Sequence, residues 1–371
     1  MQIENFITSN NMITGTGSLI KLPEEVVVFG KKILLVTGKK ALKNIGITDR
    51  IVNMLEEAGC EVRLFDNIST EPEAWEIDQG RKMASGMDVV AGVGGGSAID
   101  AAKAIAGLVN ETPGTLSYIN GTGFVPLKPG VPFIAVPTTA GAGAEATPNA
   151  VISCKAENIK ISIRADCFMA KTIIIDPELT MSNSPEVTAY SGIDAMVQAV
   201  ESYSSINATP LTRALSIEAF RLTSQSLIKA YKDGKDLKAR EDMAYGSLMA
   251  GIALANARLG LIHGLAHPMG VRYNIAHGKV CGILLPQALR INRYAMGEGY
   301  SILSKTAGED LHDFSSRLLS ELNMPSDFKS YKIPESDFKI LIEESLLSGS
   351  LKANPKKVAN DDLLEILMAV C

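Results

Sequence analysis

Three histidines within a short stretch are the residues of this sequence best suited to chemistry. His263, His267 and His277 fall within fifteen residues, although the chain of 371 residues contains four histidines in all. If residues 261–273 form a helix, His263 and His267 share one face, and Pro268 with the neighbouring glycines lets the chain return so that His277 joins them. Imidazole binds metals and transfers protons near neutral pH. The spacing therefore predicts a metal or proton-transfer site.

A carboxylate on an apolar helical segment upstream is a further candidate for this site. Asp194 and Gln198 are four positions apart, so a helix places both on one face among Ile193, Met196 and Val197. A carboxylate is costly to bury there unless a metal ion or another cation compensates its charge. The alternatives are a hydrogen-bonded polar residue for Gln198 and a satisfied core residue or helix cap for each single histidine. Taken together, these residues favour a metal site.

A glycine-rich turn in the first half of the chain has the features of a phosphate-binding loop. A strand-like apolar run leads into Gly94, Gly95 and Gly96, which are followed by Ser97 and a helical pattern. Glycines let the backbone turn tightly and approach a ligand, and the first amides of a helix attract a phosphate. A plain strand-to-helix turn is the alternative, but it needs about one glycine rather than three in succession. The motif differs from the usual Gly-x-Gly-x-x-Gly, and we expect it to bind a pyrophosphate.

A second glycine-rich loop follows another expected strand. It reads Pro137-Thr-Thr-Ala-Gly-Ala-Gly-Ala-Glu145 and offers hydroxyl groups and bare backbone amides. One such loop is weak evidence, but two at consecutive strand ends indicate a dinucleotide along the carboxyl edge of a parallel sheet.

Short apolar runs alternate with helical patterns in the first half of the chain, which is typical of βαβ units and a mainly parallel, Rossmann-like sheet. The expected strands are 33–36, 62–65, 89–93, 133–136 and 172–175, and the expected helices are 48–58, 73–84 and 98–108. From residue 187 onward only helical patterns occur, among them 188–203, 211–231, 239–257 and 301–322. The sequence thus predicts an α/β dinucleotide-binding domain (1–184) followed by an all-helical metal- and substrate-binding domain (185–371).

Composition narrows the class of partner. The net charge is −5 with 46% hydrophobic and 21% charged residues, and no basic run suggests binding to nucleic acid or to an anionic membrane. No apolar stretch approaches the length of a membrane span. The five cysteines are scattered, as expected of reduced thiols in the cytoplasm: Cys60, Cys154, Cys167, Cys281 and Cys371. A small-molecule substrate and a homodimer, the commonest assembly, are therefore expected.

Five motifs in order resemble those of the iron-containing (group III) alcohol dehydrogenase family from end to end. They are Gly-Gly-Gly-Ser, Pro-Thr-Thr-Ala-Gly-x-Gly-x-Glu, Gly-x-Asp-Ala-x-x-x-Ala-x-Glu, His-Gly-x-Ala-His-Pro-x-Gly and a later His-Gly. The resemblance implies a dehydroquinate-synthase-like fold and a metal-dependent, NAD(P)-linked alcohol dehydrogenase that also reduces small aldehydes. It implies a divalent ion, Fe(II) first and Zn(II) as the alternative. A dehydroquinate-synthase-like lyase and a metal-poor binding protein of the same fold are the alternative functions.

Matching the motifs residue by residue assigns roles. The resemblance implies metal ligands at Asp194, Gln198, His263 and His277, and a catalytic histidine at His267. The family has a histidine where this chain has Gln198, whose neutral amide oxygen is a weaker ligand than imidazole. Further cofactor-binding positions are Asp100, Thr138, Thr139, Thr147, Lys160 and Leu179, and Asn149 matches a position near the substrate.

The end of the first expected strand bears on the choice of cofactor. An acidic residue there would accept hydrogen bonds from the 2′-hydroxyl of NAD and repel the 2′-phosphate of NADP. This chain has Gly38 followed by Lys39 and Lys40, which leaves room for the phosphate and supplies positive charge. In the resembled family an aspartate at this position goes with NAD preference. NADP is therefore favoured over NAD, unless both lysines only cap the turn or face solvent.

Overall fold

The computed structural model describes residues 5–119, 125–126, 128–157 and 159–371. They form two compact units. The α/β unit comprises Thr8–Thr139 and Ala144–Thr180, and the helical unit comprises Met181–Cys371 together with Ala140–Gly143 and the segment that ends at Ile7. Ile7 is tied to the helical unit by its backbone, because the Asn256 side chain accepts from its amide at 2.7 Å and donates to its carbonyl at 2.9 Å.

Within the described residues, the α/β unit contains a parallel sheet of six strands in the order β1-β8-β5-β4-β2-β3. Their bounds are β1 (Asn11–Thr14), β2 (Lys32–Gly38), β3 (Glu61–Ile68), β4 (Val89–Gly94), β5 (Phe133–Pro137) and β8 (Thr172–Ile175). Five of the six were predicted. The short edge strand β1 was not, nor was the antiparallel hairpin of β6 (Asn149–Cys154) and β7 (Ile159–Arg164).

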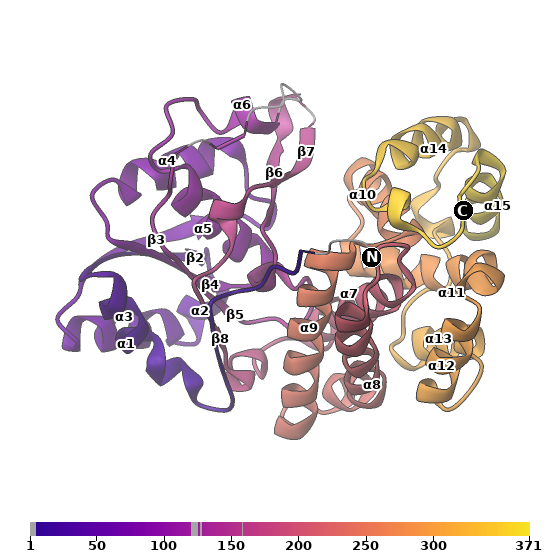
Figure 1. Cartoon of the computed structure of the whole chain (residues 1–371), viewed down its shortest axis with the longest axis horizontal. Helices are drawn as coiled ribbons and strands as arrows, with labels where there is room; N and C mark the ends of the chain where they lie inside the picture. The colour runs from indigo at the N-terminus through magenta and orange to yellow at the C-terminus, as the bar shows by residue number, and fades with distance from the viewer. Residues whose placement is uncertain (1–4, 120–124, 127, 158) are drawn as a thin grey trace. The chain divides into compact units, whose positions relative to one another are not determined.

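Helices cover both faces of the sheet, which is why its central strands are apolar along their whole length. Every residue of β4 is buried. Helices α1 (Leu22–Phe29) and α3 (Ile47–Glu57) share one core with alternate residues of the strands, such as Ile33 and Leu35. On the opposite face, a Cβ at Gly92 would lie 2.5 Å from the Cβ of Ala102 in α5 (Gly96–Leu108), so a glycine is needed for that helix to pack closely. Figure 1 shows α4 (Ala74–Ala84) beside α5.

The direction in which successive strands are added to the sheet changes between β2 and β4. β3 lies on the outer side of β2, whereas β4, β5 and β8 extend the sheet on the other side. In open parallel sheets, ligands bind outside the carboxyl ends of the strands at such a switch point. Here those ends are Gly38 of β2 and Gly94 of β4, because Thr37 is paired with Val93. The topology therefore places two of the predicted cofactor-binding glycines at the switch point of the sheet.

The second unit is built from helices. They are α7 (Pro185–Ser204), α8 (Pro210–Lys232), α9 (Leu237–Ala257), α10 (Leu261–Tyr273), α11 (His277–Met296), α12 (Glu298–Ala307), α13 (Leu311–Glu321), α14 (Phe338–Leu347) and α15 (Asn360–Val370). The prediction of one helical segment over 301–322 is wrong. Gly308 ends α12 at a φ of 84°, and Asp310 begins α13 by accepting a hydrogen bond from the His312 amide at 3.0 Å.

In the part of the chain that the structure describes, no single helix is both long and apolar enough to cross a membrane. Helices α9 and α10 reach that length and apolar character only when taken together, and the chain bends by 102° at the break between them.

Candidate metal centre and cofactor-binding edge

Four side chains of the helical unit point their donor atoms at one another. They come from three helices: Asp194 from α7, His263 from α10, and His277 with Cys281 from α11. The four donor atoms all lie within 4.8 Å of one another. His263 Nε2 is 3.2 Å from Asp194 Oδ1, and His277 Nε2 is 3.8 Å from the same oxygen. Two imidazoles, a carboxylate and a thiol at this spacing form a set that can hold a divalent ion.

The backbone explains how His277 reaches this cluster. Helix α10 continues through Pro268, so that proline does not make the turn that the sequence interpretation assigned to it. The reversal is made by Asn274, which ends α10 in the left-handed conformation at a φ of 52°. Helix α11 then starts at His277 and lies against α7. A Cβ at Gly278 would be 2.0 Å from the Tyr190 carbonyl oxygen, so this approach requires a glycine.

Glu201 orients one of the imidazoles, and sequence reasoning missed this role. Its Oε2 lies 2.6 Å from His263 Nδ1, and its Oε1 accepts from the Ile262 amide at 2.6 Å. A carboxylate on one ring nitrogen fixes the tautomer and leaves the other nitrogen free to bind a metal. Glu201 lies two helical turns after Asp194 on the same face of α7, and that spacing was the available signal.

The charges in the cluster favour a cation. Burial raises the pKa of Asp194, but hydrogen bonds from His263 and Gln198 and the nearby His277 outweigh it, so the pKa is lowered. For Cys281, burial likewise raises the pKa of the thiol, and the His277 and His263 imidazoles reverse the effect. A carboxyl and a thiol whose pKa values are both lowered at one point match the donor set of a divalent ion.

Gln198, the residue that departs from the resembled family, is buried beside this cluster. Its amide contributes to the lowered pKa of Asp194. Its Oε1 has no hydrogen-bond partner among the described residues and faces Gly143, where a Cβ would be 3.4 Å away. An unpartnered buried oxygen is costly. The site therefore fits an additional positively charged group.

His267 lies one turn along α10 from His263. It is half-buried, and its ring centroid is 5.2 Å from that of His277 with an angle of 35° between the rings. This places the predicted catalytic histidine next to the cluster without making it one of the four donors.

The glycine-rich turn after β4 has the shape that the sequence predicted. Gly94 adopts a φ of 154°, and a Cβ there would lie 2.7 Å from the Cβ of Ala98. Gly95 precedes the first turn of α5, whose amides lie at the carboxyl edge of the sheet. The Ser97 hydroxyl donates to the Thr70 carbonyl at 2.5 Å, so Ser97 offers a ligand its backbone amide rather than its hydroxyl proton.

A buried lysine, which sequence reasoning did not single out, holds the segment after β5. Lys103 is fully buried, and its Nζ donates to the carbonyls of Ala144, Thr147 and Asn149 at 2.5, 2.9 and 2.6 Å. Its Nζ is also 3.4 Å from Asp100 Oδ1. Two predicted cofactor-binding residues, Asp100 and Thr147, and the predicted substrate residue Asn149 are thus connected through one ammonium group.

Glu145, in the same segment, carries a pH-dependent part of the stability. Burial raises the pKa of its carboxyl from 4.5 to about 7, against the opposing effect of Lys103. A carboxyl group whose pKa is raised by folding contributes its full stabilisation at pH values below its pKa in the unfolded chain. This contribution to the free energy of unfolding is lost as the pH rises toward its pKa in the folded protein. Glu145→Gln should therefore reduce the loss of stability between about pH 4.5 and 7, by about 1 to 3 kcal/mol.

Urea unfolding at several pH values checks this expectation, with Glu157→Gln, an exposed carboxyl nearby in the chain, as the control. An unchanged slope of stability against pH in Glu145→Gln would show that Glu145 titrates as an ordinary carboxyl.

The second glycine-rich loop has a different explanation from the one predicted. Residues Ala140–Gly143 belong to the helical unit. A Cβ at Gly141 would lie 2.6 Å from the Cβ of Ser191, and one at Gly143 would lie 2.5 Å from the Cα of Gly251. These two glycines are required for packing against α7 and α9, whereas the sequence interpretation assigned the bare backbone to a ligand.

Comparison with known proteins decides the family. The model of iron-containing alcohol dehydrogenases matches residues 9–177, and the model of the C-terminal part of the Fe-containing alcohol dehydrogenase family matches residues 188–371. The chain belongs to the iron-containing alcohol dehydrogenase family.

Relatives of this dehydrogenase match along nearly the whole chain. Long-chain-alcohol dehydrogenase 1 of Geobacillus thermodenitrificans (strain NG80-2) is 36% identical, over 96% of this chain and 93% of that protein. The 1,3-propanediol dehydrogenase of Citrobacter freundii is 34% identical, over 96% and 94%. The crystal structure of a 1,3-propanediol oxidoreductase has a TM-score of 0.94 at 30% identity, covering 99% of this chain and 100% of that one.

Membership confirms the expected fold, a parallel-sheet α/β domain followed by a helical domain of the dehydroquinate-synthase-like kind. It also confirms the expected activity class, an NAD(P)-dependent alcohol dehydrogenase that uses a divalent metal. The lyase and the metal-poor binding protein are not favoured, because the relatives are dehydrogenases and reductases.

The remaining predicted residues of this dehydrogenase lie in the α/β unit with other partners. Asn149, at the start of β6, donates to Ser162 Oγ at 3.0 Å and accepts from Arg164 at 3.1 Å. Lys160 of β7 forms an ion pair with Glu71 at 2.7 Å. Leu179 is buried in the short helix that follows β8 (Pro177–Thr180), and Thr138 and Thr139 directly follow β5.

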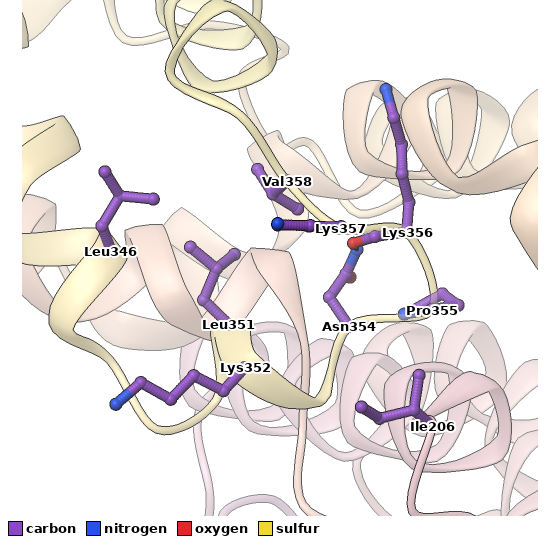
Figure 2. A pocket seen from close by; sticks show the side chains of 9 residues that line it. All are labelled: Ile206, Leu346, Leu351, Lys352, Asn354, Pro355, Lys356, Lys357 and Val358. Carbon is purple, nitrogen blue, oxygen red and sulfur yellow. Dashed lines mark hydrogen bonds between the residues drawn. The ribbon is translucent and has the colours of Figure 1, made fainter.

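A groove of about 380 Å³ lies elsewhere in the helical unit. Figure 2 shows two of its lining residues, Asn354 and Lys352, with the Lys352 side chain extending away from Asn354. It is lined by Ile206, Leu346, Leu351, Lys352, Asn354, Pro355, Lys356, Lys357 and Val358. None of these residues belongs to the histidine cluster. Lys356 already pairs with Asp362 at 2.6 Å.

Proposed function

We propose that this dehydrogenase interconverts small primary alcohols and aldehydes with NADP(H), using a metal held by the helical unit. The α/β unit serves as the dinucleotide-binding domain that the sequence predicts over 1–184, and the helical unit serves as the metal- and substrate-binding domain predicted over 185–371. The observation that carries the proposal is the convergence of Asp194, His263 and His277 at one point. The Nε2 atoms of His263 and His277 lie 3.2 and 3.8 Å from Asp194 Oδ1. The α/β unit supports it with a glycine turn at the switch point of its sheet.

The residues of the cluster have separate tasks. Asp194, His263 and His277 would hold the ion, Fe(II) first and Zn(II) as the alternative, and Gln198 is the predicted neutral ligand beside them. When bound, the ion polarises the substrate oxygen as a Lewis acid. Glu201 keeps Nε2 of His263 directed at the site through its 2.6 Å contact with Nδ1. His267 contacts the substrate or nicotinamide and passes the hydroxyl proton to solvent.

Residues at the carboxyl edge of the sheet would hold the cofactor. Gly94, Gly95, Gly96 and the Ser97 amide receive the pyrophosphate at the N-terminus of α5. Thr138, Thr139 and Leu179 follow neighbouring strand ends, which supports their assignment to the same ligand. Asp100, Thr147, Lys160 and Asn149 are proposed to complete the cofactor and substrate sites.

The substrate class is supported by the relatives, whose names include long-chain alcohols, 1,3-propanediol, butanol and sulfoacetaldehyde. Nicotinamide absorbance, followed with metal supplied, tests the proposal on short aldehydes, hydroxyaldehydes and acid semialdehydes. No turnover on any of them would contradict it. We also propose that the enzyme works in the cytoplasm as a homodimer, which cell fractionation and light scattering test directly.

The preference for NADP(H) depends on Gly38. A Cβ at Gly38 would have only the Ile68 carbonyl within range, at 4.0 Å, so an aspartate fits without strain. Lys40 is exposed, and Lys39, whose Nζ is 3.9 Å from Glu76, is half-exposed. Gly38→Asp should lower the NADPH-to-NADH ratio of kcat/KM by about 10- to 100-fold, the scale of one hydrogen bond to a charged group.

The matched control is Gly38→Asn, which fills the same space without a charge and should shift the ratio less. The ratio is measured by steady-state kinetics with both cofactors. A wild-type enzyme whose kcat/KM is clearly higher with NADH rules the preference out.

A further inference from the structure

We infer that the Cys281 thiolate is a ligand of the metal, so that the protein donors are Asp194, His263, His277 and Cys281 rather than a set completed by Gln198. This inference rests on the proposed metal site and names one more of its ligands. It changes the donor set from two nitrogens and two oxygens to two nitrogens, one oxygen and one sulfur.

Four of the six distances between donor atoms are close to those of a tetrahedral site. Ligand bonds of about 2.0 to 2.3 Å at tetrahedral angles separate neighbouring donors by about 3.3 to 3.6 Å. Cys281 Sγ is 3.7 Å from His277 Nε2 and 4.0 Å from His263 Nε2. The same two nitrogens are 3.8 and 3.2 Å from Asp194 Oδ1. The four atoms thus surround one point, and most of these distances are slightly longer than those between the ligands of a bound ion.

The position of Cys281 is also unlike that of an ordinary buried cysteine. A free buried cysteine usually packs as a small apolar side chain. Cys281 is fully buried, but its sulfur faces two imidazole nitrogens, and it lies one turn after His277 on the same face of α11. Glycine at position 278 lets this face of α11 approach α7, since a Cβ there would collide with the Tyr190 carbonyl.

Gln198 occupies a different position in the cluster. Its Oε1 is buried against Gly143, where a Cβ would be 3.4 Å away, and has no hydrogen-bond partner among the described residues. A neutral amide oxygen is a weaker ligand than a thiolate for a borderline ion such as zinc. We therefore assign the fourth position to the sulfur of Cys281 rather than to the amide.

A thiolate ligand has a consequence for metal choice. Soft sulfur favours zinc and cobalt over hard, oxygen-preferring ions such as manganese and magnesium. We expect the purified enzyme to take up one equivalent of zinc or cobalt.

Cobalt(II) loading of the full-length protein tests the inference through a readout that is independent of turnover. Wild type should show an intense near-ultraviolet thiolate-to-cobalt charge-transfer band, and Cys281→Ser should lose the band while still binding cobalt. Gln198→Ala should keep it. Zinc affinity, measured by chelator competition, should fall about 10- to 100-fold or more in Cys281→Ser. Cys154→Ser, a cysteine of the other unit, is the matched control and should leave both readouts unchanged.

X-ray absorption at the zinc edge gives a second measurement that does not depend on a variant. Zinc-loaded wild type should show one zinc–sulfur distance of about 2.3 Å. Cobalt or zinc uptake without the sulfur band, or without the zinc–sulfur distance, would overturn the inference and leave the proposed function intact. Failure of wild type to bind any of these metals, together with no aldehyde reduction, would overturn both.

Discussion

The His277→Ala variant should lose at least about a thousandfold in kcat/KM, because removal of the metal's Lewis acidity costs several kcal/mol in the transition state. His277 is one of the four ligands proposed from the sequence, and its Nε2 lies 3.8 Å from Asp194 Oδ1 and 3.7 Å from Cys281 Sγ. Its ring is 37% exposed, so the truncation leaves little buried space and the fold should be retained. Steady-state kinetics measures this loss, and elemental analysis measures the loss of bound metal that should accompany it.

The matched control is His312→Ala. His312 has a similar exposure of 38% but lies on α13 beside Asp313, away from the donor cluster. It should keep both metal and activity. A His277→Ala protein that retains a full equivalent of metal and near-wild-type kcat/KM would show that His277 is no ligand.

The Lys103→Met variant should lower the free energy of unfolding by about 3 to 5 kcal/mol, the cost of removing one partner from a buried charged group. The substitution keeps the length of the side chain but leaves the carbonyls of Ala144, Thr147 and Asn149 without their donor. It also removes the positive charge that faces Asp100. Urea unfolding, followed by circular dichroism, measures the change.

Because the same ammonium group connects the segment after β5 to α5, Lys103→Met should also weaken cofactor binding. Fluorescence titration with NADPH measures this second effect. Lys82→Met, an exposed lysine on the neighbouring helix α4, is the control and should leave both quantities near wild type. A Lys103→Met protein with an unchanged unfolding midpoint would mean that the carbonyls find other partners.

Local pattern was enough to predict most of the elements. Apolar residues recur with a characteristic period within each strand and each helix. This period can be recognised from consecutive residues alone. The same locality explains why the histidine cluster was found: His263 and His267 are one turn apart, and His277 follows a short connection. It also explains the failure over 301–322, where the helical period continued across a break that Gly308 and Asp310 impose.

Tertiary structure decided which side chains meet. Cys281 had no sequence signal beyond its spacing from His277, and Glu201 none beyond its spacing from Asp194. Their contacts depend on α11 and α10 being packed against α7, which a glycine at 278 permits. The role of Lys103 could not be predicted either, because its hydrogen-bond acceptors lie more than forty residues further along the chain.

The sequence by itself therefore determined the order of elements, the family and three of the donors proposed for the metal. Only the tertiary structure brought Cys281 and Glu201 to that site, and only the tertiary structure showed that Gly141 and Gly143 are needed for close packing. The physical reason is that helix and strand periods arise from interactions between near neighbours. The chemistry of a site arises from distances between residues that only packing sets.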